Sequence, residues 1–318
     1  MAFFCPFLLC PQDVQDKEGR YPVKDTFSTF DPLINFIFYL GAFLFGMLWV
    51  HPAFLACSFL LSCAYYLTIK GRKGWKMILG VLPVFVMIAV INPLFNLQGE
   101  HVIFTYMNGR PYTFEALCYG IALGAMFVSV LMWFASYSAV MTSDKFLYLF
   151  GKIAPSISLV LTMILRLVPE YQKKITQISA ARKCIGKSGD AGNVTEKAEN
   201  GLTLVSALTS WALEGGIVTA DSMRSRGYGS GKRTTFSIYR MEWRDKVLMV
   251  VFVILMTVIL GCSFMGGAEA SYTPGIEVPG FDNTYCVMGT IAYFAFLAIP
   301  TVINLVEVMV WRILRSKI

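Results

Sequence analysis

The side chains best suited to bind a partner lie in two basic stretches, each closed by a glycine. The residues concerned are Arg182, Lys183 and Gly186 in the first stretch and Arg224, Ser225, Arg226 and Gly227 in the second. A guanidinium group presents a planar fork of donors that matches the two oxygens of a carboxylate. Basic groups beside a membrane also suit lipid phosphates. The two stretches therefore indicate binding, either to an acidic protein partner or to lipid headgroups.

A catalytic alternative exists at residues 181–188, which match a loose phosphate-loop pattern with Ala181 in place of the first glycine. That chemistry requires a strand, a loop of inward-pointing N–H groups and then a helix, with Lys187 on the phosphates. The residues before Gly186 are helix-like and basic, and no apolar strand ending in Asp follows to hold Mg²⁺. We therefore expect a coincidental match, no catalytic residues and no enzymatic activity in this chain.

The sequence gives little support to a metal site. Two histidines and eight scattered cysteines in 318 residues show no zinc-ligand spacing. Cys262 and Cys286 flank one loop and could pair, but free thiols are expected at membrane depth. We predict no metal site, no cofactor in this chain and no nucleic-acid partner.

Helices must position the two basic stretches. A short helix is expected at 145–150, a long one from Pro155 toward Ile185, and a third at about 203–226, with a flexible connector at 187–200. Cations in the last turn of a helix complement its dipole, and a glycine such as Gly227 suits the left-handed residue that ends it. Both basic stretches, including Arg182 and Arg226, are thus predicted to lie at exposed helix ends.

An apolar stripe runs along the third of these helices. Leu204, Leu208 and Trp211 recur at helical spacing. They would form either a platform under a partner protein or the packing between the two long helices, and the pattern favours neither.

The elements around this region are expected to cross a membrane. Of all residues, 56% are apolar and 15% charged, against about 45–50% and 25% in soluble domains. Roughly 20 apolar residues span a bilayer as a helix. Six stretches fit or nearly fit: 33–50, 53–69, 77–97, 114–141, 247–265 and 285–311. The predicted fold is an all-α polytopic membrane protein with six transmembrane helices and long cytoplasmic helices between the fourth and fifth.

The charges predict which parts face the cytoplasm. Of the 27 Lys and Arg, 26 lie in the termini, in the loop after the second span and in residues 143–246, and only Arg110 lies elsewhere. Cationic segments stay in the cytoplasm, so these parts and both termini are predicted to be cytoplasmic. The predicted regions are a cytoplasmic tail (1–30), four spans (31–142), a cytoplasmic helical region (143–246), and two spans with the C-terminal tail (247–318).

Several motifs together resemble those of one protein family. The run Ser222-Met223-Arg224-Ser225-Arg226-Gly227-Tyr228 resembles the second Ala-Arg-Gly signature of the transmembrane T component of energy-coupling factor (ECF) transporters, the EcfT/CbiQ family. Three further elements resemble that family in the same order: Asp31-Pro32, Asn92-Pro93 and Leu165-Arg166-Leu167-Val168-Pro169. The resemblance covers roughly residues 31–240.

The first signature departs from the family pattern. It aligns with Ala181-Arg182-Lys183-Cys184-Ile185-Gly186, in which Ile185 stands in place of the arginine. Arg182 lies three residues earlier, on roughly the same face of a helix. By this resemblance we expect Arg182, or else Lys183, to supply the cation.

The resemblance implies a division of labour in an ABC-type importer. Two cytoplasmic ATPase subunits would bind ATP and Mg²⁺, and a membrane S component would bind the vitamin or transition-metal ion. This chain would be the non-catalytic T subunit: its signature residues would dock into the two ATPases, and its long helices would transmit their closure to the S component. The setting would be the cell membrane of a prokaryote, and the S component would determine the substrate.

A self-sufficient membrane permease or channel is the alternative function. Such proteins usually place ionisable residues within the membrane. Here Glu115 lies at the start of the fourth expected span and Glu307 near the end of the sixth. The lack of a buried charge cluster favours a coupling subunit.

Overall fold

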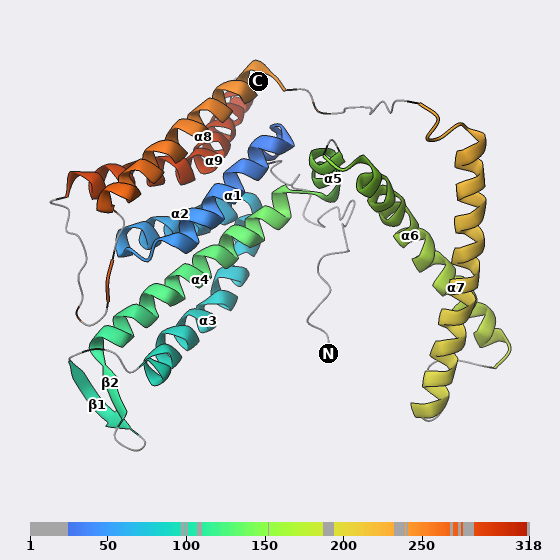
Figure 1. Cartoon of the computed structure of the whole chain (residues 1–318), viewed down its shortest axis with the longest axis horizontal. Helices are drawn as coiled ribbons and strands as arrows, with labels where there is room; N and C mark the ends of the chain where they lie inside the picture. Colours follow the sequence, from blue (N-terminus) through green and yellow to red (C-terminus); the bar gives the residue numbers. More distant parts are fainter. Residues whose placement is uncertain are drawn as a thin grey trace. The chain divides into compact units, whose positions relative to one another are not determined.

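The computed structural model describes residues 25–96, 99, 101–106, 110–151, 153–186, 194–231, 239, 241–267, 270–272, 275 and 283–316. Within these residues the regular structure is helical apart from one short β-hairpin (Figure 1). The chain divides into two compact units, one made of residues 1–142 and 239–318 and the other of residues 143–238. Most of the predicted N-terminal tail, residues 1–24, lies outside the described residues.

The first unit contains, in its described part, six apolar helices. They are α1 (Pro32–Leu48), α2 (Pro52–Lys70), α3 (Gly74–Phe95), α4 (Phe114–Val140), α8 (Trp243–Cys262) and α9 (Thr284–Ser316), one for each expected span. The stretches Pro52–Phe95, Phe114–Val140, Trp243–Gly267 and Thr284–Val310 are long and apolar enough to cross a membrane, and α1 is a shorter apolar helix. The prediction of an all-helical polytopic membrane protein is confirmed.

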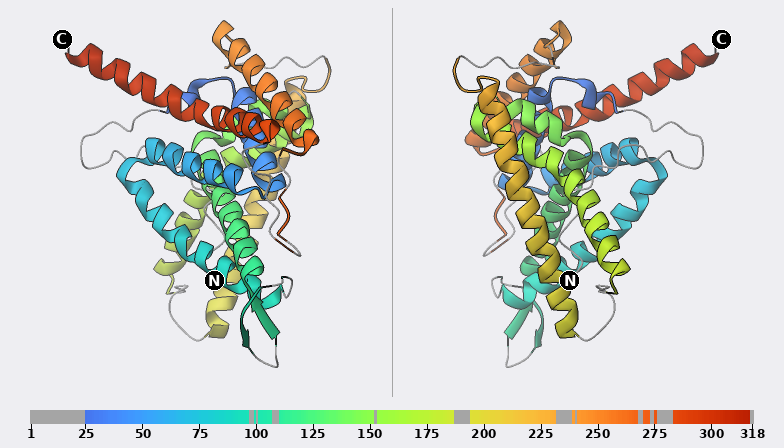
Figure 2. Two further views of the ribbon diagram at one scale, coloured as in Figure 1. Left: turned by 90° about the vertical axis from the view of Figure 1, so that its left-hand side faces the viewer. Right: turned by 90° about the vertical axis from the view of Figure 1, so that its right-hand side faces the viewer.

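A β-hairpin between α3 and α4 was not expected from the sequence. β1 (Val102–Tyr106) pairs antiparallel with β2 (Arg110–Thr113), and β2 leads directly into α4 (Figure 2). Gly99 precedes the hairpin with φ 135°, and a Cβ there would lie 2.6 Å from a carboxylate oxygen of Glu115. The same carboxylate lies 2.7 Å from Nδ1 of His101. The buried Glu115 side chain thus holds the segment that enters the hairpin.

Side-chain caps and prolines define where the first two spans begin. Asp31 accepts the N–H of Leu33 at 2.9 Å before α1. His51 Nδ1 accepts the N–H of Ala53 at 3.3 Å before α2. In each helix a proline occupies the first position, where its missing N–H removes no intrahelical bond. Capping and proline together fix both helix starts.

Cys262 and Cys286 are buried free thiols, as expected. Cys286 Sγ lies 3.6 Å from Nε2 of His51. Because Nδ1 of that ring accepts a backbone N–H, Nε2 carries the ring proton and can donate it toward the sulfur. The contact ties α9 to the start of α2.

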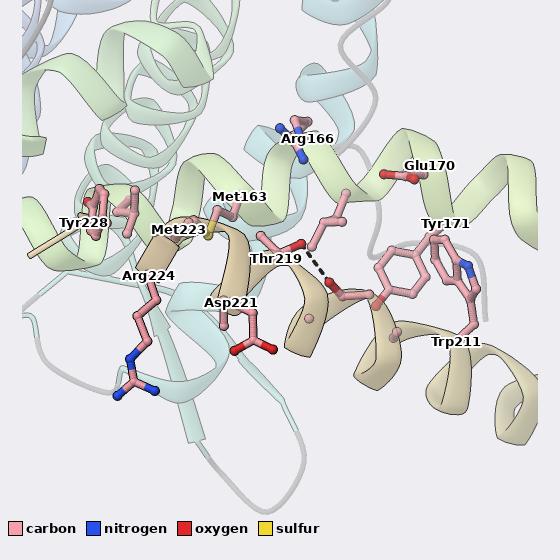
Figure 3. A pocket seen from close by; sticks show the side chains of 16 residues that line it. Met163, Arg166, Glu170, Tyr171, Trp211, Thr219, Asp221, Met223, Arg224 and Tyr228 are labelled. Atoms are coloured by element: carbon pink, nitrogen blue, oxygen red, sulfur yellow. Dashed lines mark hydrogen bonds between the residues drawn. The ribbon is translucent and has the colours of Figure 1, made fainter. Parts of the chain in front are cut away.

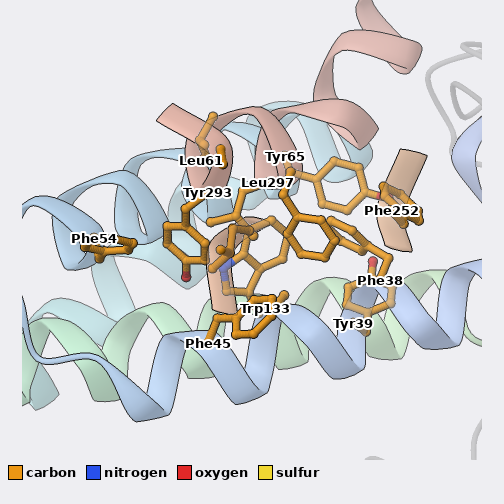
Figure 4. Close-up of a cluster of buried hydrophobic side chains, with 14 of the residues drawn as sticks. Phe38, Tyr39, Phe45, Phe54, Leu61, Tyr65, Trp133, Phe252, Tyr293 and Leu297 are labelled. Carbon is orange, nitrogen blue, oxygen red and sulfur yellow. The ribbon is translucent and has the colours of Figure 1, made fainter. Parts of the chain in front are cut away.

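The core of the first unit is aromatic. Phe38 of α1 packs against Trp133 of α4 with ring centroids 5.5 Å apart (Figure 4). It also packs against Phe296 of α9, with ring centroids 5.2 Å apart. Trp133 is fully buried, and its Nε1–H donates to Ser58 Oγ at 3.1 Å. Lipid tails are as apolar as these side chains, so close packing and buried hydrogen bonds must hold membrane helices together.

Gly120 allows α3 and α4 to approach each other closely. A Cβ at this position would lie 2.8 Å from the carbonyl oxygen of Ala89 and 3.1 Å from Cβ of Asn92. The first of these atoms is backbone, so a side chain would force the helices apart. Small residues play this role at many membrane-helix interfaces.

Gly120→Ala is therefore expected to destabilise the first unit by about 1–3 kcal/mol, the range for an overpacked interior. Thermal unfolding of the purified chain in detergent measures the change. Gly80→Ala is the matched control, because Gly80 lies within α3 with no atom within 4 Å of the added methyl group. Helix propensity alone predicts up to about 1 kcal/mol of stabilisation for that control. Equal midpoints for the two variants would contradict the close packing at Gly120.

The second unit contains α5 (Ser143–Gly151), α6 (Pro155–Cys184) and α7 (Val194–Ser225). α7 begins earlier than the sequence predicted, since residues 194–200 are helical and do not belong to a flexible connector. Glu, Lys and Ala in that run favour helix. The rest of the expected connector, with Lys187, lies outside the described residues. By length and composition α7 could also cross a membrane, so its cytoplasmic placement stays a prediction.

Candidate functional site

α6 and α7 pack against each other in the second unit. Tyr171 of α6 and Trp211 of α7 meet edge to face, with ring centroids 5.4 Å apart. Nζ of Lys174 lies 5.5 Å from the centroid of the same indole ring. Such aromatic and cation–π contacts contribute about 0.5–1.5 kcal/mol each. Trp211 therefore packs between the two helices.

The other two residues of the apolar stripe lie on the same helix. Leu204 and Leu208 of α7 are half-buried, like Trp211. Packing against α6 accounts for the burial of Trp211, and a role of the stripe beneath a partner protein stays a prediction.

An open cleft of about 590 Å³ runs between α6 and α7 (Figure 3). Its lining is largely apolar or small, and includes Leu159, Met163, Leu167, Gly215, Gly216 and Met223. Charged residues also border it, namely Arg166 and Glu170 from α6 and Asp221 and Arg224 from α7. Figure 3 shows Asp221 and Arg224 extending away from α6. The charged groups of Asp221 and Arg224 thus face outward from the helix pair.

α7 ends in a glycine turn that displays its last basic residues. Gly227 has φ 72°. The N–H groups of Gly227 and Tyr228 donate to the carbonyl oxygens of Arg224 and Met223, each at 3.0 Å. These bonds form a Schellman motif, whose left-handed residue is glycine because a Cβ would be strained there. Arg226 immediately precedes the glycine and is exposed.

The exposed side chains at this end are two guanidinium groups and one hydroxyl. Within the described part of the chain, Arg224 and Arg226 have no hydrogen bond or ion pair from their side chains. The hydroxyl of Ser225 donates to the carbonyl oxygen of Asp221 at 2.6 Å, one turn back along the same helix. Both guanidinium groups are therefore available to a partner, whereas the serine hydroxyl already has an acceptor.

α6 ends in the same kind of turn. Gly186 has φ 76°, and its N–H donates to the carbonyl oxygen of Lys183 at 3.1 Å. Ile185 precedes this glycine in the position that Arg226 holds in α7, and it is 71% exposed. Lys183 is exposed as well. The turn therefore presents an apolar side chain at the tip of α6, where α7 presents an arginine.

Arg182 does not lie free at the end of α6, contrary to the expectation from the sequence. It is half-buried. Its Nη1 donates to the backbone oxygen of Asn200 at 3.0 Å, and its Nη2 donates to Oδ1 of the same residue at 2.6 Å. Asn200 lies in the part of α7 that was expected to be a flexible connector. Since the sequence did not predict that helix, it could not predict a partner for Arg182 on it.

The described residues do not support a phosphate loop or a metal centre. Residues 181–184 belong to α6, where a phosphate loop requires a strand and then a turn. Lys187 and Ser188 lie outside the described residues. In the part of the chain that the structure describes, no three His, Cys, Asp or Glu side chains gather as metal ligands would.

Comparison with known proteins supports one family over most of the chain. No family model matches the sequence. The Staphylococcus aureus energy-coupling factor transporter transmembrane protein EcfT is 19% identical over 262 residues, which cover 78% of this chain and 97% of that protein. The proteins of the same name from Lactococcus lactis and Brevibacillus brevis are each 26% identical, cover 63% and 64% of this chain, and are themselves covered over 75% and 81% of their lengths.

Proposed function

We propose a coupling role for this chain, on the premise that it is, by distant homology, an EcfT transmembrane component of an ECF transporter. Such a component is a multi-pass, non-catalytic transporter subunit. In the proposed role, the chain passes the closure of two cytoplasmic ABC-type ATPases to a membrane S component that binds a vitamin or a transition-metal ion. ATP and Mg²⁺ bind to the ATPases.

The observation that carries the proposal is the matched pair of glycine turns in the second unit. Both α6 and α7 end in a left-handed glycine, Gly186 and Gly227, with exposed side chains just before it. At the end of α7, the guanidinium groups of Arg224 and Arg226 have no partner in the described chain. Two helix ends of the same geometry fit two subunits of one kind, each receiving one end.

Coupling then follows from the contact between the two helices. Tyr171 and Trp211 join α6 to α7 away from their C-terminal ends. When the ATPases close on ATP, they bring the docked ends together, and the angle at which the helices cross changes. Leu204, Leu208 and Trp211 lie along α7 and would move with it beneath the S component.

The orientation belongs to the same proposal. The second unit and both termini face the cytoplasm, because nearly all Lys and Arg lie in those parts. Docking involves the helix-end turn that contains Lys183 and Gly186 and the turn that contains Arg224, Ser225, Arg226 and Gly227. Ser225 contributes only its backbone there, because its hydroxyl already donates to Asp221. The surrounding bilayer is the cell membrane of a prokaryote.

A self-sufficient permease is the less favoured function. Within the described part of the first unit, three acidic residues are buried as whole residues, and all lie at helix starts: Asp31, Glu115 and Asp245. Glu307 is half-buried and lies in the last third of α9. Asp31 and Asp245 each accept a backbone N–H at the start of their helix. Glu115 accepts the N–H of His101 and so holds the segment before the hairpin. Each of the three buried acids thus has a structural role away from mid-membrane, where a carrier would need it.

Reconstitution tests the proposal directly. Vesicles that contain this chain with its cognate ATPases and S component should take up substrate only when ATP is supplied. Omission of the ATPases or the S component should abolish uptake, while this chain alone should hydrolyse no ATP. ATP-independent uptake by the chain alone would support the permease and exclude the coupling role.

A further inference from the structure

The matching turns allow residues of α6 and α7 to be compared position by position. Counting back from the left-handed glycine, Ile185 corresponds to Arg226, and Arg182 corresponds to Met223. Met223 is half-buried and lines the cleft between the two helices. The position three residues before the tip therefore faces the neighbouring helix in α7.

Arg182 follows the same geometry in α6. Its guanidinium group reaches α7, where both terminal nitrogens donate to oxygens of Asn200. Because the planar guanidinium group donates to two oxygens of the same residue, the contact fixes the orientation of the Arg182 side chain as well as its distance from α7. The contact joins the last turn of α6 to the second turn of α7.

The tip of α6 has a different chemistry. Ile185 exposes 71% of its surface, and its neighbour Cys184 is also exposed. A large apolar side chain at a helix tip gains free energy when a partner removes it from water. A carboxylate facing it would instead lose hydration without gaining a donor.

We infer that Arg182 is a positioning residue that holds α6 to α7, and that the α6 end meets its ATPase through Ile185 in an apolar socket without a carboxylate. The inference rests on the proposed function for the identity of the partner. The two docking ends of this chain are consequently not interchangeable: the α7 end binds through charge and the α6 end through apolar contact. The Arg182–Asn200 contact keeps the Ile185 tip in place while the ATPases move.

Amide hydrogen exchange of the purified full chain tests the Arg182–Asn200 contact between α6 and α7. Arg182→Ala should speed exchange of the amides at 194–200 by roughly 10- to 100-fold, as loss of a charge-assisted pair of hydrogen bonds implies. Asn200→Ala keeps the backbone acceptor and should have a smaller effect. The double variant should match Arg182→Ala, because the two residues act as one unit.

ATPase binding and substrate transport by the full complex test whether Ile185 docks the ATPase and Arg182 only positions the helix. Ile185→Asp should weaken ATPase binding about tenfold or more and leave exchange at 194–200 unchanged, while Ile185→Leu should bind like the natural chain. Arg182→Ala should keep most ATPase binding but import less substrate per ATP hydrolysed. A purely structural role of Arg182 would not change that ratio in a complex that still assembles.

Opposite results would overturn the inference. If Arg182→Ala abolishes ATPase binding with exchange unchanged, Arg182 is itself a docking residue. If Ile185→Asp binds fully while Arg226→Ala does not, the α6 end does not dock through Ile185. If neither Ile185→Asp nor Arg226→Ala weakens ATPase binding, the proposed function fails. The exchange data alone then decide whether Arg182 holds the two helices together.

Discussion

Replacing Arg226 with alanine is expected to weaken ATPase binding at the α7 end by roughly 30- to 5,000-fold. Loss of one member of a desolvated, hydrogen-bonded charge pair costs about 2–5 kcal/mol, which converts to that range of dissociation constants. The effect is large because Arg226 lies exposed before a left-handed glycine and has no partner in the described chain. Its donors are therefore free to meet a partner carboxylate.

The fold of the chain should not change in this variant. An exposed side chain without contacts usually contributes within about 0.5 kcal/mol to stability, so Arg226→Ala should unfold at the same temperature as the natural chain. Co-purification with tagged ATPase subunits and ATP-driven uptake measure the loss of binding.

Two neighbouring changes serve as controls. Arg226→Lys should restore only part of the binding, because an ammonium group cannot form the bidentate pair. Ser225→Ala should bind normally, since the serine hydroxyl already donates to the carbonyl oxygen of Asp221. Full ATPase binding by Arg226→Ala would show that this helix end is not a docking element.

The spans of the first unit could be predicted from sequence because a membrane imposes a simple rule. A chain in a bilayer must satisfy its backbone within each segment and needs roughly 20 apolar residues to cross. Six such stretches appear in the sequence, and each is a helix in the structure. The hairpin at 102–113 escaped prediction because it is short and lies between two spans, where a loop is the default.

The ends of the long helices were predictable for a local reason. Gly227 follows two arginines after an apolar stripe, which is the usual pattern of a helix C-terminus, and the structure places Gly227 in the left-handed region. The partner of Arg182 was not predictable, because it depends on how α6 and α7 pack. The matching positions of Arg182 and Met223, each four residues before its glycine, indicate only which face of α6 carries Arg182, not which residue it contacts.

The orientation of the chain gives the second large expected effect. Residues 143–246 hold 16 of the 27 Lys and Arg, whereas the segment between α3 and α4 holds only Arg110. Since cationic segments resist translocation, the hairpin should lie outside the cell and α7 inside. α7 is itself long and apolar enough to cross a membrane, so an experiment must decide between a cytoplasmic α7 and an inserted one.

Two matched cysteine variants provide that decision. Thr105→Cys in β1 and Thr195→Cys in the first turn of α7 change exposed threonines on the two predicted sides, in a chain whose eight native cysteines are replaced. An impermeant thiol reagent on intact cells should label the cysteine at 105 and not the one at 195. After permeabilisation both should be labelled, because both positions are open to solvent. Labelling of position 195 in intact cells would place this end of α7 outside, beyond the reach of cytoplasmic ATPases, and would exclude the docking role proposed for the second unit.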